Sequence, residues 1–303
     1  MLHMNRLALI ISFVALTAAT ARAQEIATIN PDAATAGMAN ASTAVSGSSY
    51  SVYGNAAAAL FDFERFAAGF SYMPWKSGGA KSNFYSVAGY YSFDEKNTLA
   101  AGTRIYKMPG AAGYRQMEAS ADVAYARLVH DCAGVAVTAH YLHGSYGSGV
   151  GYDALSFDLS MYSQIPLDKM LDGSWVSVGA KIADIGFAFG DSKSRLPSRA
   201  NAGAAIYAPI GDSHSLTGSI DLGYRFAPKG TGSFGASVGA EYILMNLLSL
   251  RAGYHVADKY GLNYGTVGAG INFLMLRVDF AYTIAEKNSP LRNLYTISAG
   301  IHF

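Results

Sequence analysis

Alternating apolar and polar residues are the feature of this sequence that most restricts its fold. Successive side chains of a β-strand point to opposite faces, so an alternating stretch forms a strand with one apolar and one polar face. In "LTGSIDLGYRF" the apolar face carries Leu216, Ile220, Leu222, Tyr224 and Phe226. In "LRVDFAYT" it carries Leu276, Val278, Phe280 and Tyr282. The pattern predicts a chain built from strands.

About fourteen such stretches follow one another from residue 65 onward, with no notable helical stretch between them. They are expected near 65–74, 83–93, 98–107, 116–129, 134–143, 152–163, 174–185, 199–208, 215–226, 233–243, 248–256, 263–273, 276–284 and 292–303. An even number of strands about 9–12 residues long is typical of bacterial outer-membrane barrels. The predicted fold is all-β, a transmembrane antiparallel β-barrel.

The first residues have the pattern of a secretory signal peptide, expected over 1–23. Arg6 precedes an apolar run over 7–19, and the small-residue triplet Ala21-Arg22-Ala23 precedes Gln24. Cleavage is expected between Ala23 and Gln24. An N-terminal anchor helix is the alternative, but the apolar run is short for a membrane span.

Composition narrows the class of protein further. Charged residues make up 14% of the chain and hydrophobic residues 51%, yet no run of about twenty apolar residues follows the signal peptide. An exported apolar chain without spanning helices can satisfy its backbone in a membrane as a closed barrel, so outer-membrane lipid is an expected partner. The formal net charge of +1 argues against nucleic-acid binding. The single Cys132 cannot form an internal disulfide.

Aromatic residues gather near the expected strand ends, as in the two interfacial girdles of a membrane barrel. They include Tyr72, Trp75, Tyr91, Phe93, Tyr162, Trp175, Tyr224, Phe226, Tyr254, Tyr264, Tyr282 and Tyr295. The last strand, "LYTISAGIHF", ends on an aromatic residue and resembles the C-terminal signal that the barrel-assembly machinery reads. Its apolar face carries Tyr295, Ile297, Ala299, Ile301 and Phe303.

An uncharged segment from Ala33 to Leu60 precedes the first expected strand and is rich in Ser, Thr, Asn, Gly and Ala. A barrel of about fourteen strands is wider than its own side chains can fill. Small side chains allow close backbone packing, and hydroxyl and amide groups can bond to a polar wall. Residues 24–62 are therefore predicted to form a plug inside a barrel spanning 63–303.

The polar faces of the strands carry charges of both signs. The basic residues are Arg104, Lys181, Arg225, Arg251 and Arg277, and the acidic residues are Glu118, Asp122, Asp158, Asp221, Glu241 and Asp279. Internal ion pairs that set strand register and hold the plug are one interpretation. A polar conduction path through the lumen is the other.

No catalytic, cofactor-binding or metal-binding constellation emerges from the sequence, which predicts a non-enzymatic protein. His140 and His143 read as H-x-x-H, but on a strand they point to opposite faces and cannot share a metal. "GSGVG" at 147–151 is not followed by a helical pattern, so it is interpreted as a turn between strands and not as a phosphate loop.

The N-terminal segment resembles the start of PorV/PorQ family proteins, which are outer-membrane components of the type IX secretion system of Bacteroidetes, related to FadL barrels. The resemblance rests on "PDAATAGMANASTAVSGSSYSVYGNAAAAL" and "FSYMPW". Matching positions in the plug are Pro31, Asp32, Ala33, Gly37, Met38, Ala41, Asn55 and Ala57, and those in the first strand are Tyr72, Pro74 and Trp75. Ala39 and Ala56 stand where the family has Gly and Pro.

The resemblance implies two functions. The first is a partner-binding barrel for type IX secretion components or cargo at the outer membrane. The second is a FadL-like transporter of hydrophobic small molecules, in which the plug shifts and the ligand leaves sideways through the wall. An apolar pocket between plug and wall would favour the transporter, and a closed wall would favour the partner-binding barrel.

Overall fold

The computed structural model describes residues 25–77, 80–108, 116–146, 151–167, 171–190, 196–258, 261–287 and 289–303. The predicted signal peptide, its cleavage site at Ala23 and Gln24, and the predicted turn at 147–150 lie outside the described residues. Within these ranges, no helix combines the length and apolar character needed to cross a bilayer.

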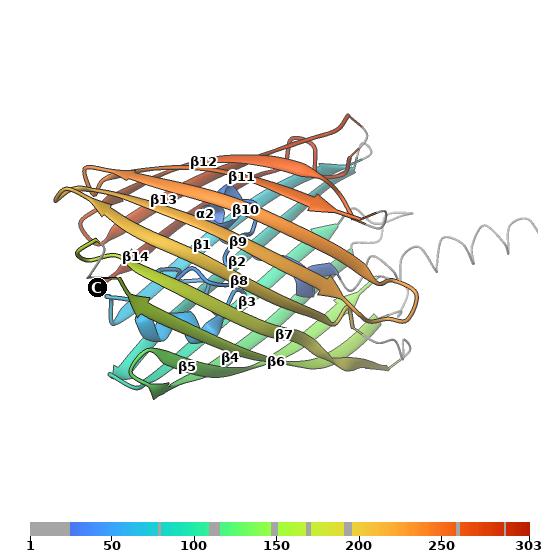
Figure 1. Cartoon of the computed structure of the whole chain (residues 1–303). Coiled ribbons are helices and arrows are strands. Elements are labelled where there is room, and N and C mark those ends of the chain that lie inside the picture. The colour runs from blue at the N-terminus through green and yellow to red at the C-terminus, as the bar shows by residue number, and fades with distance from the viewer. Residues whose placement is uncertain are drawn as a thin grey trace, which may run out of the picture.

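Fourteen strands form one closed antiparallel barrel, which confirms the predicted fold (Figure 1). They are β1 (Phe66–Ser77), β2 (Ala80–Asp94), β3 (Asn97–Met108), β4 (Gln116–His130), β5 (Ala133–Ser145), β6 (Gly151–Pro166), β7 (Trp175–Gly190), β8 (Arg199–Ile210), β9 (His214–Arg225), β10 (Ser233–Leu244), β11 (Leu248–Ala257), β12 (Tyr264–Phe273), β13 (Leu276–Ala285) and β14 (Tyr295–His302). Each strand pairs with the next, and β1 closes the barrel on β14.

Strand bounds agree with the alternation to within three residues except at the end of β7. β7 continues to Gly190, five residues beyond its predicted end. β14 begins at Tyr295 instead of residue 292, because Asn293 adopts a left-handed backbone conformation and residues 290–293 form turns. Alternation alone does not reveal such a turn inside an apolar stretch.

The two faces of the wall separate as the alternation predicts. On β9, Ile220 is 51% exposed and faces outward, whereas Ser219 and Asp221 are buried and face the lumen. The girdle prediction is wrong for four residues: Tyr162 is buried against Phe61, and Tyr264 accepts a hydrogen bond from Asn40 of the N-terminal segment. Trp75 and Trp175 line cavities inside the barrel. A position near a strand end predicts a place in a girdle, but the alternation puts these side chains on the inner face of the wall.

The barrel has a turn end and a loop end. The turn end carries the short connections 94–97, 130–133, 210–214, 244–248 and 273–276 together with the C-terminus. The loop end carries the connections that follow the odd-numbered strands β1 to β13. The wall is uneven, because β6 and β7 have 16 residues each and β11, β12 and β13 have 10 each.

Residues 25–62, here called the inner segment, lie within the barrel (Figure 1). The segment contains the 3₁₀ turn η1 (Glu25–Thr28), the short helix α2 (Ala33–Gly37) and the 3₁₀ turn η2 (Ala56–Phe61). α2 packs against β11 to β14, and η2 packs against β3 to β6 on the other side of the lumen. The inner segment therefore bridges opposite walls.

Wall glycines let the inner segment approach the strands at backbone distance. A Cβ on Gly253 of β11 would lie 2.6 Å from the backbone nitrogen of Ala39, and one on Gly239 of β10 would lie 2.7 Å from the carbonyl oxygen of Met38. Both distances are shorter than a Cβ tolerates, so the backbone of residues 38 and 39 packs here only because the wall lacks side chains.

The wall changes its pairing in the middle of β7. A bulge next to Asp158 places Phe157 opposite Ile185 and Leu159 opposite Ile182, and Asp184 within it has a left-handed backbone. Pairing of β7 with β8 ends at Ala183, opposite Arg199, although β7 continues for seven more residues. Among the described residues, the loop-end half of β7 is therefore paired on one edge only.

Candidate functional site

The inner segment owes its local shape to two side-chain caps. Asp32 accepts hydrogen bonds from the Ala34 backbone nitrogen and the Thr35 hydroxyl, which caps the N-terminus of α2. Asn55 caps η2 by accepting from the Ala57 nitrogen at 3.1 Å. Both cap residues are buried, and both belong to the motif singled out from the sequence.

The other motif residues pack between these caps and the wall. Asn55 donates to the carbonyl of Met161 on β6, and the carbonyl of Gly37 accepts from Thr266 on β12. Met38 packs on the wall glycines. Pro31, Ala33 and Ala57 are buried. The motif therefore gives the segment its turns and its points of contact with the barrel.

A buried ionic chain on the inner wall begins at Arg104 of β3, which donates to the carbonyls of Ile26 and Ala27. Its guanidinium lies 3.1 Å from Asp122, whose carboxylate lies 2.6 Å from His140 Nδ1. All three wall side chains are almost completely buried. The start of the inner segment is thus held by a cation that has its own counter-charge.

The same chain ends at a second cation. His140 Nε2 lies 3.1 Å from Asp158, and Lys181 Nζ lies 2.7 Å from the same carboxylate. Lys181 donates to the carbonyls of Tyr53 and Gly54 at 3.1 and 2.8 Å. Two distant parts of the inner segment are therefore anchored to one continuous set of buried charges.

This cluster also brings together three metal-ligand types, because atoms of His140, Asp158 and Asp184 lie within 4.8 Å of one another. Lys181 is 2.7 Å from Asp158, and Arg199 is 3.6 Å from Asp184. Two protein cations thus already lie against the carboxylates that would bind the metal. The arrangement fits an ion-pair network better than a metal centre.

A second ionic group lies beneath α2. Arg251 lies 2.6 Å from Glu241 and 2.7 Å from Asp279, and Arg277 lies 2.8 Å from the other oxygen of Asp279. Arg277 also donates to the carbonyl of Gly47 in the inner segment. Charges on β10, β11 and β13 are joined in this way, so the group links three strands and reaches across β12.

The remaining predicted lumen charges lie outside these two ionic groups. Asp221 accepts from the backbone nitrogens of Ser42 and Thr43 at 3.0 and 2.8 Å. Glu118 is buried and accepts from the Tyr146 hydroxyl. Arg225 lines a cavity at the loop end and is half-buried. Each of the eleven charges singled out from the sequence is on the inner face, but they do not form one site.

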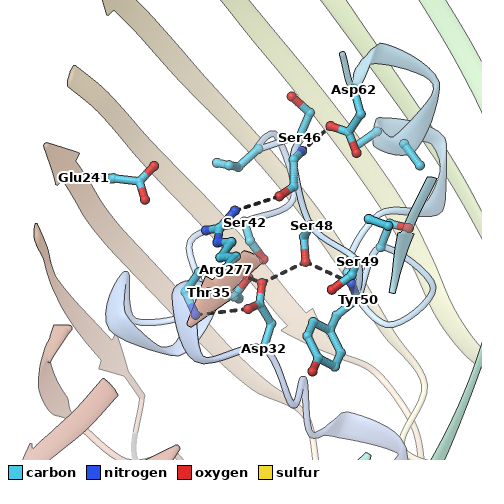
Figure 2. Close-up of a pocket in the computed structure, with 18 of the residues that line it drawn as sticks. Asp32, Thr35, Ser42, Ser46, Ser48, Ser49, Tyr50, Asp62, Glu241 and Arg277 are labelled. Atoms are coloured by element: carbon cyan, nitrogen blue, oxygen red, sulfur yellow. Dashed lines mark hydrogen bonds between the residues drawn. The ribbon is translucent and has the colours of Figure 1, made fainter. Parts of the chain in front are cut away.

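A cavity of about 380 Å³ lies between the inner segment and the wall toward the turn end. Figure 2 shows hydroxyl groups of the inner segment around it, with Asp62 and Arg277 at its side. Asp62 accepts a hydrogen bond from the Gly47 backbone nitrogen. Burial raises the pKa of the Asp62 carboxyl to about 7, against the smaller opposing effect of its hydrogen bonds. The lining is mixed, since Tyr162, Trp175 and Tyr207 also contribute.

A second cavity of about 490 Å³ lies toward the loop end. Its lining combines polar groups such as Asn201 and His255 with the apolar side chains of Ile29, Met73 and Leu294. Asn30 of the inner segment lines both cavities. The inner segment therefore lies between the loop-end cavity and the turn-end cavity of the lumen.

The three apolar residues of the loop-end cavity belong to, or pack against, a buried apolar cluster beside β7. Its members are Ile26, Ala27, Met73, Phe84, Leu142, Tyr152, Ala154, Ala188 and Leu196. Ala188 is on the part of β7 that has lost its β8 partner, and Leu196 follows β7 in the chain. An apolar interior thus meets the wall where pairing is incomplete.

Sequence reasoning missed His140 within the ionic chain and the pair of Asp184 and Arg199 beside it. His140 shares its face with the inward Thr138, which is a signal that alternation offers. Asp184 has no such signal, because the bulge changes the phase of the alternation within β7. Arg199 is the first residue of its strand, where a face is hard to assign.

Comparison with known proteins gives the fold. No protein-family model and no curated protein matches the sequence. Among solved structures, the toluene transporter TbuX of Ralstonia pickettii is similar with a TM-score of 0.58 and 12% identity, over 91% of this chain and 98% of that one. The monoaromatic hydrocarbon channel CymD is similar with a TM-score of 0.62 and 12% identity, over the same shares of the two chains.

A FadL homologue of Pseudomonas aeruginosa is similar over 90% of this chain and 98% of that one, with a TM-score of 0.57 and 11% identity. At these identities the likeness concerns architecture. The chain has the fold of FadL-like outer-membrane barrels along nearly its whole length.

Proposed function

We propose that this protein is an outer-membrane transporter for small hydrophobic molecules. The observation that carries the proposal is the apolar cluster around Ile26 and Leu196, which meets the wall where β7 loses its β8 partner. A water-filled pore does not require an apolar cluster. The transfer of an apolar ligand from water into such a cluster is favourable. The hydrocarbon transporters among the structural neighbours support the same class of ligand.

The proposed path has three steps. A ligand enters the loop-end cavity, whose apolar lining includes Ile29, Met73 and Leu294. It then takes the place of Ile26 within the apolar cluster. It leaves sideways past Ala188, where the wall is paired on one edge only, and so avoids crossing the ionic chain below.

Residues 24–62 act as the plug in this proposal. Hydrogen bonds donated by Arg104 and Lys181, and hydrogen bonds accepted by Asp221, hold the plug by its backbone. Partner binding of the PorV/PorQ type was the first expectation from the sequence. It now ranks second, because no family model matches the sequence and the neighbours TbuX and CymD are a toluene transporter and a hydrocarbon channel.

Uptake of a radiolabelled monoaromatic hydrocarbon by cells that produce the protein tests the proposal. Ala188→Phe adds bulk inside the apolar cluster and should reduce uptake severalfold. Ala240→Phe adds the same bulk on the exposed outer face of β10 and should leave uptake unchanged. Uptake equal to that of cells without the barrel, or equal reduction by both substitutions, would overturn the transporter.

Planar-bilayer recording tests the plug separately. Deletion of residues 33–60 leaves all fourteen strands and the C-terminal residues in place, so the barrel should still assemble. The intact protein should conduct little, and the deleted form should show large, steady openings. Equal conductance of the two forms would exclude residues 33–60 as the element that closes the lumen.

A further inference from the structure

Two neighbouring turns at the turn end expose large apolar side chains. The turns 244–248 and 273–276 connect β10 to β11 and β12 to β13, and a hydrogen bond from the Asn272 nitrogen to the Leu247 carbonyl joins them. Leu274 is 82% exposed at the tip of its turn. We call the following exposed residues the apolar rim: Met245, Leu247, Phe273, Leu274, Met275 and Leu276.

Turn geometry does not explain these residues. Met245 and Leu274 have left-handed backbone conformations, with φ of 55° and 56°. Glycine and asparagine are the residues that favour this conformation, and a leucine there is uncommon. Met245 and Leu274 are therefore present despite the backbone conformation, which points to a contact made by their side chains.

Other turns at the same end have a different character. The turn from β2 to β3 carries Asp94, Glu95 and Lys96, all exposed, and the turn from β8 to β9 carries the exposed Asp212. Charged side chains at exposed turns are stable only when they are hydrated. The end of the barrel is therefore divided into a charged arc and an apolar arc.

The strands at the apolar rim are the shorter ones on average: β11, β12 and β13 have 10 residues and β10 has 12, whereas β2 and β3 at the charged turn 94–97 have 15 and 12. Ten residues at about 3.3 Å each and a tilt of about 40° span roughly 25 Å, which equals the apolar band of an outer-membrane barrel. β11, β12 and β13 have this length, so their turns begin where the hydrocarbon ends. β6 and β7, with 16 residues each, span roughly 40 Å by the same reasoning and extend beyond the band.

The apolar rim also continues the outward face of the wall without a polar interval. Leu250 of β11, Ile271 of β12 and Val278 of β13 are 48%, 53% and 51% exposed on that face. Residues 271–276 thus carry the apolar surface from the strands onto the turn. An occupant that covers the outer face of β11 to β13 also reaches the apolar rim.

We propose that the apolar rim inserts into the phospholipid leaflet on the turn-end side of the membrane, so that the short side of the barrel has no water-exposed turns there. The charged arc remains in water. The occupant is lipid and not a second protein, because the rim is continuous with the lipid-facing wall. This inference rests on the proposed outer-membrane location.

Depth-dependent fluorescence quenching tests the insertion in the full-length protein carrying Cys132→Ser. Single cysteines replace Leu274 in the rim, Glu95 in the charged arc and Val278 on the lipid-facing wall, and each is labelled with an environment-sensitive fluorophore. The labelled proteins are reconstituted in vesicles of phosphatidylethanolamine and phosphatidylglycerol that contain brominated acyl chains. Emission at positions 274 and 278 should fall severalfold more than emission at position 95.

The outcomes separate the inference from the proposal beneath it. Quenching at 278 but not at 274 overturns the inserted rim and leaves the membrane barrel standing. No quenching at 278 overturns the membrane location itself. Crosslinking of Leu274→Cys to a second copy, with emission at 274 independent of bromination, would show a protein interface in place of lipid and also overturn the inference.

Discussion

Replacement of Lys181 by methionine should release the inner segment from the wall. Lys181 is buried and donates to the carbonyls of Tyr53 and Gly54. Charge-assisted hydrogen bonds contribute about 1.5–3 kcal/mol each, and an unpaired buried acceptor costs about 1–3 kcal/mol. Methionine occupies similar volume, so packing offsets part of this loss. A net loss of about 2 kcal/mol in the free energy of docking is a conservative value. It lowers the ratio of docked to released inner segment about thirtyfold.

Lys181→Met has a second effect that must be separated from the first. Removal of the Lys181 ammonium group, which lies 2.7 Å from Asp158, leaves that buried carboxylate without this partner. Breaking a buried ion pair lowers the free energy of unfolding by about 3–5 kcal/mol. That cost weakens the barrel whether or not the inner segment is docked. The double variant Lys181→Met with Asp158→Asn removes the stranded charge, and it should restore barrel stability without restoring docking.

Planar-bilayer conductance reports docking, and heat-modifiable migration reports the folded barrel. Lys181→Met and the double variant should both open far more often than the unchanged protein. Lys107→Met replaces an exposed lysine of β3 and should change neither measurement. A folded Lys181→Met barrel that stays as closed as the unchanged protein would refute the claim that these two hydrogen bonds hold the inner segment.

Three further predictions concern other parts of the chain. Gly253→Ala should also open the lumen, because the new Cβ would lie 2.6 Å from the Ala39 nitrogen. The control Gly218→Ala meets only ordinary contacts and should leave the lumen closed. Equal conductance of the two variants would contradict the close-packing argument. The pKa of Asp62 is raised to about 7, so docking should weaken as pH rises from about 4 through 7, and this dependence of conductance should vanish in Asp62→Asn. Phe303→Asp should let precursor accumulate in the periplasm, as seen by cell fractionation, and normal amounts of heat-modifiable barrel would show that the terminal aromatic is no assembly signal.

Alternation in the sequence was sufficient to predict the strands and most of their bounds, for a physical reason, whereas the barrel also required the strand lengths, the aromatic girdles and the C-terminal strand. Every wall residue faces either outward or into the lumen, so the period of two is visible in nearly every strand, as on β9 with Ile220 outside and Asp221 inside. The prediction fails where the backbone leaves that period. The bulge at Asp184 and the turn before Tyr295 are such places.

The candidate site could be predicted only as a list of residues. The sequence showed that Arg104, Lys181 and Asp158 belong on the polar face, and that an uncharged segment precedes the strands. It could not show that His140 joins Asp122 to Asp158, since these side chains come from separate strands, β5, β4 and β6. Such contacts depend on register, which places Asp122 opposite His140 and Thr138 opposite Asp158.

The sequence by itself determined the strands and the side on which most wall residues lie, because both follow from local periodicity. The tertiary structure alone decided how the lumen is divided, since that depends on where a segment without periodicity packs. It also decided where the wall loses pairing, and it placed the two apolar turns side by side. These features arise from closure of the barrel, which brings β14 back to β1 and aligns residues far apart in the chain.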